Sequence, residues 1–266
     1  MAERLRDIFS LTNRVAVVTG GYGYLGATMV RALAAFDAKV VVAGRSEETF
    51  LRVFTSAERK IISFHHLNIT DSESVNQCIN KVIEIFGHID ILVNNAHAAK
   101  GQSPDKMSDD DWTYTMEGVV GSVHKCIRAV IPHMKKHGSG KIINTASMYG
   151  IVSPDLSIYK GENCEIYLNP PHYGAAKAAM IQLTKYYAVL LGDSNIQVNA
   201  ISPGPFPNAS VQRGNKAFIE RLKNHNPLHK IGGPEDLAGA LILLSSNASD
   251  FMTGQNIQVD GGWTIW

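Results

Sequence analysis

Short apolar runs alternate along the chain with longer segments in which apolar residues recur every three or four positions. The short runs predict strands at Val15–Val18, Lys39–Ala43, Ile61–His65, Ile91–Asn94, Lys141–Ala146, Gln197–Ile201 and Asn256–Val259. The longer segments predict helices at Leu25–Phe36, Glu47–Glu58, Ser72–Phe86, Asp109–Lys136, Tyr173–Leu191 and Pro234–Ser245. Alternating strands and helices build a parallel sheet with helices on both faces. The pattern therefore predicts an α/β fold with one doubly wound parallel sheet of about seven strands.

Composition limits the kinds of partner and the location that we expect for the chain, and it is consistent with the predicted fold. The 266 residues carry a net charge of +1, and the basic residues are scattered, which argues against a nucleic-acid or membrane partner. We find no repeat or linker, so residues 1–266 are expected to form a single domain. No run approaches the roughly 18 apolar residues of a membrane span, and no signal peptide is evident. The three distant cysteines show no metal spacing and suit reduced thiols, so a cytoplasmic protein without a metal is expected.

A glycine-rich turn, Thr19–Gly26, lies between the first predicted strand and the first predicted helix. Gly20 permits a tight turn, and Gly26 permits close packing of helix against sheet. The helix N-terminus that follows supplies free backbone amides and the positive end of a dipole to a phosphate. This context predicts a Rossmann-type dinucleotide site.

The end of the second predicted strand bears on the form of the dinucleotide. An acidic residue there would bind the adenosine ribose and repel a 2′-phosphate, but Gly44 and Arg45 occupy the place. Arg45 can bind a 2′-phosphate through charge-assisted hydrogen bonds. We therefore expect NADP, with NAD possible if Arg45 is only a solvated loop residue or stacks on adenine.

Three residues predict the chemistry. Ser147 follows an apolar strand, at the sheet edge where ligands bind, and can hydrogen-bond a carbonyl or alcohol oxygen. Tyr173 and Lys177 are four residues apart and share a helix face, so the lysine cation can lower the pKa of the phenol. The set predicts proton transfer by Tyr173 coupled to hydride transfer. The alternative is that both residues are structural: Ser147 forms a turn, and Tyr173 is an amphipathic residue at an interface.

With these residues placed, the chain resembles the short-chain dehydrogenase/reductase family over nearly its whole length. The matching segments are Thr19–Gly26, Asn94–Ala96, Ile142–Ser147, Tyr173–Lys177, Asn199–Gly204, Thr253–Gln255 and Val259–Gly262. The resemblance implies a substrate lid near residues 205–228 and a homotetramer or homodimer. It implies that Ser147, Tyr173 and Lys177 are catalytic, and that the cofactor contacts Thr19, Gly20, Tyr22, Tyr24, Leu25, Gly26, Arg45, Asn68, Ile69, Asn95, Ala96, Tyr173, Lys177, Pro203, Gly204 and Phe206.

The chain departs from the family pattern at four positions. Tyr24 stands where the turn usually has its middle glycine, and His97 where the fourth-strand motif usually ends in glycine. Asn68 replaces an aspartate that commonly contacts adenine, although an amide can make the same hydrogen bond. Gly118 falls at or beside the place of an asparagine that usually supports a proton-relay water.

An insertion near residues 152–171 separates Ser147 from Tyr173 by more residues than the family usually has. Its polar and aromatic side chains suit a hydroxyl-rich ligand, and it begins and ends within the site. We expect the substrate to contact His97, Ser147, Tyr149 and Tyr173. The segment resembles sugar-acting members of the family, such as gluconate 5-dehydrogenase-like or surface-glycan biosynthesis enzymes. The predicted activity is the interconversion of a secondary alcohol and a ketone on a sugar-like substrate.

Three alternatives remain, two for the substrate and one for the role of the chain. The insertion could be purely structural, in which case the substrate is an apolar ketone or an acyl thioester. The chain could also be a cofactor-binding regulator of weak catalytic activity.

Overall fold

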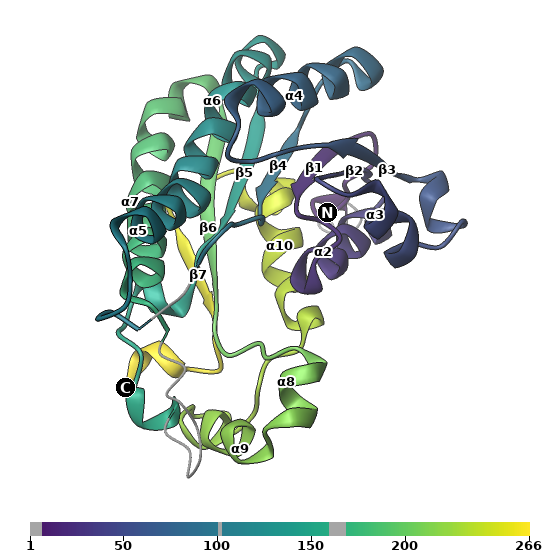
Figure 1. Cartoon of the computed structure of the whole chain (residues 1–266). Helices are drawn as coiled ribbons and strands as arrows, with labels where there is room; N and C mark the ends of the chain where they lie inside the picture. The colour runs from purple at the N-terminus through teal and green to yellow at the C-terminus, as the bar shows by residue number, and fades with distance from the viewer. Residues whose placement is uncertain (1–6, 101–102, 160–168) are drawn as a thin grey trace.

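The computed structural model describes residues 7–100, 103–159 and 169–266, and its centre is a parallel sheet in the order β3-β2-β1-β4-β5-β6-β7 (Figure 1). The strands are β1 (Val15–Thr19), β2 (Lys39–Gly44), β3 (Ile62–His66), β4 (Ile91–Asn94), β5 (Gly140–Thr145), β6 (Ile196–Pro203) and β7 (Asn256–Val259). Chain order reverses between β1 and β4, which are neighbours in the sheet. The predicted doubly wound α/β fold is confirmed, and this switch point is where such sheets bind ligands.

Helices cover both faces of the sheet. One face carries α4 (Ser72–Phe86), α6 (Ser122–His137) and α7 (Pro171–Leu191), with α5 (Asp109–Met116) leading into α6. The other face carries α2 (Tyr24–Ala35), α3 (Glu47–Val53) and α10 (Ala238–Ser245).

Strand β1 shows why its apolar run is continuous rather than alternating. Val15 and Val17 belong to the core cluster under α4, α6 and α7, while Ala16 and Val18 belong to the cluster under α2, α3 and α10. Successive side chains of a strand point to opposite faces, so a strand covered on both sides needs apolar residues at every position.

Two predicted helices differ from the observed ones. The helix expected over residues 47–58 ends at Val53, because Phe54 adopts an extended backbone and Glu58 accepts a hydrogen bond from the Thr55 amide at 2.7 Å. The helix expected over residues 109–136 contains a π-helical turn, η2 (Glu117–Gly121), between α5 and α6. Long-range contacts at Gly118, described below, explain this turn.

The segment predicted to be a lid contains two helices, α8 (Ala209–Gly214) and α9 (Lys216–Asn224), which lie beyond the carboxyl ends of the strands (Figure 1). Ile219 and Leu222 of α9 pack with Ile158 of the insertion and with Trp263 near the C-terminus. The described start of the insertion, including η4 (Leu156–Tyr159), therefore packs directly on the predicted lid. Residues 160–168 of the insertion lie outside the described residues.

Two further observations concern the chain as a whole. Within residues 7–100, 103–159 and 169–266, no helix has the length and apolarity needed to span a membrane. Cys78 and Cys126 are buried and carry free thiols, whereas Cys164 lies outside the described residues.

Candidate active site

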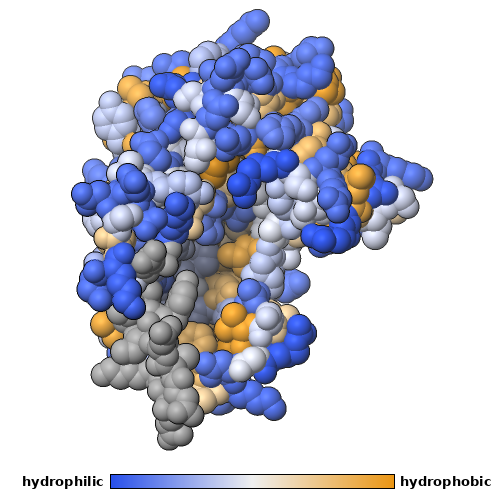
Figure 2. Space-filling view, viewed as in Figure 1, coloured by the Kyte–Doolittle hydropathy of each residue, from blue (hydrophilic) through white to orange (hydrophobic). Residues whose placement is uncertain are grey.

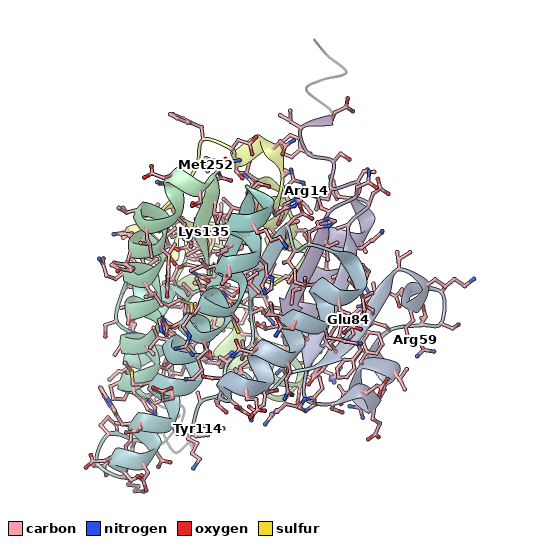
Figure 3. The ribbon with its side chains drawn as sticks, turned by 90° about the horizontal axis from the view of Figure 1, so that it is seen from above. Arg14, Arg59, Glu84, Tyr114, Lys135 and Met252 are labelled. Carbon is pink, nitrogen blue, oxygen red and sulfur yellow. The ribbon has the colours of Figure 1, made fainter. Side chains whose placement is uncertain are left out.

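A cavity of about 520 Å³ lies at the carboxyl ends of β1, β2, β4, β5 and β6. Arg14, which precedes β1, and Met252, which precedes β7, lie at the opposite end of the molecule from Tyr114, which lines the cavity (Figure 3). The structure brings most of the predicted site residues together here: Gly20, Tyr22, Tyr24, Leu25, Gly26, Arg45, Asn68, Ile69, Asn95, Ala96, His97, Ser147, Tyr173, Lys177, Pro203, Gly204 and Phe206. Of the predicted residues, Thr19 and Tyr149 do not line it.

The glycine turn fits a dinucleotide phosphate group. Gly20 has a φ of +62°, and a Cβ on Gly26 would lie 2.4 Å from the Gly20 carbonyl oxygen, so both positions require glycine. Gly23 is the N-cap of α2 and offers no side-chain cap. The first amides of α2 therefore remain available to an anion at the cavity wall.

Thr19 supports the turn from behind rather than from the cavity. Its side chain is buried, and its hydroxyl oxygen accepts hydrogen bonds from the amides of Asn95 and Ala96, each at 3.0 Å. The Asn95 side chain donates in return to the Thr19 carbonyl at 3.0 Å. These bonds join the ends of β1 and β4, so Thr19 positions residues that line the cavity.

Tyr22 shapes the place where Arg45 lies. Its hydroxyl accepts hydrogen bonds from the amides of Arg45 at 2.9 Å and Ser46 at 3.3 Å. Its ring covers Gly44, where a Cβ would lie 2.5 Å from the ring. The end of β2 is therefore held against the glycine turn, with Arg45 on the cavity wall.

Asn68 also lines the cavity, but its amide oxygen is already engaged. That oxygen accepts hydrogen bonds from the Thr70 amide at 3.2 Å and the Thr70 hydroxyl at 2.9 Å. The side-chain amide nitrogen of Asn68 is the group that can reach the adenine base, to which it would donate a hydrogen bond.

The structure places Ser147, Tyr173 and Lys177 on the same cavity. Two glycines allow this: a Cβ on Gly150 would lie 2.8 Å from the backbone of Lys177, and one on Gly174 would lie 2.9 Å from the Tyr149 carbonyl oxygen. The turn that carries Ser147 thus packs directly on the backbone of α7. The Ser147 hydroxyl accepts from the Tyr149 amide at 3.1 Å, which leaves its own proton to donate to a substrate oxygen.

Lys177 is buried beside the phenol. Its Nζ lies 5.7 Å from the centre of the Tyr173 ring and donates to the Thr145 carbonyl at 2.6 Å. Burial lowers the pKa of Lys177 to about 7. The side-chain amino group is therefore divided between its charged and neutral forms near neutral pH.

His97 faces Tyr173, with the two rings edge to face and 6.1 Å between their centres. Desolvation within the cleft, followed by the positive charge of Lys177, lowers the pKa of His97 to about 4. The imidazole, which lines the cavity, is therefore neutral near pH 7 and can donate or accept a hydrogen bond.

Tyr149 lies behind the cavity wall. Its hydroxyl is bonded to that of Tyr159, and burial raises its pKa far above the ordinary value. The phenol is protonated at all ordinary pH values. The structure thus places Tyr149 in support of Tyr159 and does not bring its hydroxyl to the cavity.

The π-helical turn contains Gly118, which falls at or beside the place where the sequence resemblance leads one to expect an asparagine. The Gly118 carbonyl accepts from the Ala98 amide at 3.0 Å and from the Ser122 hydroxyl at 3.0 Å. A Cβ on Gly118 would lie 2.1 Å from the Ala98 carbonyl oxygen. Only glycine fits this approach.

A second cavity, of about 570 Å³, adjoins the first and shares Gly204 and Phe206 with it. Its described lining residues are Met148, Tyr159, Asn169, Gly204, Pro205, Phe206, Pro207, Val211, Asn215, Phe218, Arg221 and Leu222. In Figure 2 the molecule is hollowed between the sheet and the α8–α9 segment, with hydrophobic residues on the visible wall. Only the approximate range of the lid was predicted from the sequence, and none of its residues except Phe206 was named as a site residue. The helical spacing of Phe218, Arg221 and Leu222 is the one local pattern that could have indicated them.

A glycine turn at a helix N-terminus, with serine, tyrosine and lysine on the same cavity, is the arrangement of a dinucleotide-dependent oxidoreductase. The chain belongs to the short-chain dehydrogenase/reductase family, whose members are NAD(P)-dependent oxidoreductases: the family model described as enoyl-(acyl carrier protein) reductase matches residues 24–264.

Its relatives differ in their substrates. It is 30% identical to 3-oxoacyl-[acyl-carrier-protein] reductase of Thermotoga maritima, over 96% of this chain and 99% of that protein. It is 32% identical to gluconate 5-dehydrogenase of Gluconobacter oxydans, over 97% of this chain and 98% of that protein. A gluconate 5-dehydrogenase from Burkholderia cenocepacia, solved with NADP and tartrate, superposes with a TM-score of 0.84 at 31% identity and covers 97% of this chain and 98% of its own.

Proposed function

We propose that this enzyme interconverts a secondary alcohol and a ketone on a sugar-like, polyhydroxylated substrate, with NADP as its preferred cofactor. The observation that carries the proposal is the convergence of Ser147, Tyr173 and Lys177 on one cavity that adjoins a second. A substrate held across both cavities places its reacting carbon beside these three residues.

Each catalytic side chain has a separate task. In the oxidative direction Tyr173 takes the proton of the substrate hydroxyl, and in the reductive direction it returns one. Ser147 donates a hydrogen bond to the reacting oxygen. Lys177, when charged, favours the phenolate form of Tyr173. The nicotinamide ring, when bound, supplies or accepts the hydride.

Two kinds of evidence support a hydroxylated substrate. Tyr159, Asn169, Asn215 and Arg221 give the second cavity several hydrogen-bonding groups. Among the relatives is a gluconate 5-dehydrogenase, and the related structure from Burkholderia cenocepacia holds tartrate, a hydroxylated acid.

A second candidate is a more apolar ketone or an acyl thioester. Met148, Phe206, Val211, Phe218 and Leu222 give the second cavity a largely apolar wall. The relative from Thermotoga maritima, a 3-oxoacyl-[acyl-carrier-protein] reductase, is consistent with such a substrate.

A substrate panel separates the two candidates. We expect NADP-linked oxidation of gluconate or glucitol, followed as NADPH absorbance, to exceed the turnover of cyclohexanones and of acetoacetyl thioesters. Turnover confined to the cyclohexanones or the thioesters would contradict the proposed substrate class while leaving the oxidoreductase chemistry intact.

Arg45→Asp is expected to weaken NADPH binding by roughly 10- to 100-fold, because it removes charge-assisted hydrogen bonds and adds repulsion. NADH affinity should be retained, as measured by fluorescence titration. Arg52→Asp makes the same charge change on α3, away from the cavity, and serves as the control. Equal losses for both cofactors would refute the assignment of Arg45 to the 2′-phosphate.

We further propose that the chain is one catalytic domain with a lid near residues 205–228 and works in the cytoplasm as a homotetramer or homodimer. On α7, Tyr186, Val189 and Leu190 are 61%, 86% and 51% exposed, which supports a subunit contact there. Sedimentation equilibrium distinguishes these assemblies from a monomer.

A further inference from the structure

Arg221 is the one charged side chain among the described residues that line the second cavity. It projects from α9, between the buried residues Ile219 and Leu222 and the ring of Phe218, which packs on Tyr159 with 5.5 Å between ring centres. Apolar side chains make up most of the surrounding wall. A cation in such a setting attracts an anionic ligand more strongly than one in open solvent.

The guanidinium of Arg221 is oriented but not neutralised. Its Nε donates to the Ile158 carbonyl at 2.7 Å, which fixes the group against the start of the insertion. Within the described part of the chain, its terminal amino groups have no hydrogen-bond partner and no carboxylate pairs with it. An arginine held in this way keeps the two donors that match a carboxylate.

The second cavity adjoins the one that Ser147, Tyr173 and Lys177 line. Gly204 and Phe206 line both, and Met148, on the wall of the second, directly follows Ser147. Tyr173 packs against the same apolar cluster as Leu222, the neighbour of Arg221. A single ligand can therefore reach from the catalytic residues to the guanidinium.

A second polar group on this wall also lacks a partner. Among the residues that the structure describes, none hydrogen-bonds the buried amide oxygen of Asn169, which lines the same cavity. A buried amide that is left unpaired costs stability, and a ligand hydroxyl would satisfy it.

We propose that Arg221 binds a carboxylate of the substrate, at the end of the molecule remote from the reacting carbon, and so selects hydroxy or oxo acids over neutral analogues. The inference rests on the proposed function for the position of the reacting carbon. It adds the requirement that the substrate carry a carboxylate, a group that membership of the polyols or of the apolar ketones does not by itself supply. Asn169 then hydrogen-bonds a substituent near the carboxylate.

Matched pairs of ligands test the proposal. Gluconate and glucitol differ only in a carboxylate against a primary alcohol, and 4-oxocyclohexanecarboxylate and 4-methylcyclohexanone form an apolar pair. We expect the acid of whichever pair is used to have the higher kcat/KM and, by calorimetry with NADP present, the tighter binding.

Arg221→Gln keeps an amide donor for the Ile158 carbonyl while removing the charge. We expect it to lower kcat/KM for the acid by roughly 10- to 100-fold, mainly through KM, and to change the neutral analogue less than about threefold. Arg221→Lys should restore part of the loss. Arg213→Gln, on α8 and away from both cavities, is the matched control and should leave both ligands unaffected.

The outcomes separate this inference from the proposed function. Turnover of the cyclohexane pair but not the sugar pair contradicts the sugar-like substrate, and Arg221 is then judged on the cyclohexane pair. Equal binding of acid and neutral ligand, or equal loss of both in Arg221→Gln, overturns the role of Arg221 in either case. If neither pair turns over, the calorimetric comparison decides alone.

Discussion

Tyr173→Phe should lower kcat by about 10²- to 10⁴-fold while leaving the affinity for NADP nearly unchanged, because the change removes only the group that transfers the proton. Ser147 would still donate a hydrogen bond to the substrate oxygen, and the cofactor end of the cavity is untouched. Steady-state kinetics with the best substrate of the panel, together with fluorescence titration of NADPH, give the two quantities.

Tyr187→Phe is the matched control for this experiment. Tyr187 belongs to the same helix, α7, and its hydroxyl bonds His124 Nδ1 at 2.7 Å, away from the cavity. The same chemical change there should alter kcat less than about threefold. Comparable activity of the two variants would remove Tyr173 from the proton-transfer step.

Lys177→Met should abolish most of the activity and at the same time flatten the pH dependence of stability. Burial lowers the pKa of Lys177 in the folded protein to about 7, whereas an unfolded lysine titrates near pH ~10.4. Between these values the unfolded chain binds one more proton than the folded one, so the free energy of unfolding rises with pH, by up to about 1.4 kcal/mol per unit. Below pH 7 the folded protein carries the full cost of the buried charge.

The test compares urea unfolding of the cofactor-free wild type and Lys177→Met at pH values from 6 to 10. Methionine loses the hydrogen bond to the Thr145 carbonyl, a roughly constant cost across this range. The stability of the variant relative to wild type should be greatest at pH 6 and decrease as the pH rises from about 7 to about 10. Parallel curves for the two proteins would show that Lys177 keeps an ordinary pKa.

Local pattern was enough to predict the sheet, most of the helices that cover it and the residues expected to carry the chemistry. The apolar runs of β1, β4 and β5 and the turn at Gly20–Gly26 each lie within a short stretch, and the structure confirms the fold and brings Ser147, Tyr173 and Lys177 to one cavity. Parallel strands place their carboxyl ends along the same edge, which is why residues distant in sequence could be grouped in advance.

Features that depend on distant contacts were not visible in the sequence. Tyr149 was expected to contact the substrate, yet its hydroxyl is bonded to that of Tyr159 in the insertion, and Tyr149 lines neither cavity. Arg221 lies in a segment whose course depends on packing against Ile158, and no local pattern reports that contact. Glu58, expected to lie in the helix of α3, instead bonds the Thr55 amide and pairs with Arg31, which lies on another helix.

The close approach of Ala98 to Gly118 constrains how this enzyme can diverge. An asparagine cannot be introduced at position 118 alone, since its Cβ would fall 2.1 Å from the Ala98 carbonyl oxygen. The loop carrying His97 and Ala98 must move first. Position 118 and this loop are therefore coupled, and a side chain at 118 is tolerated only in a variant whose loop has been rebuilt.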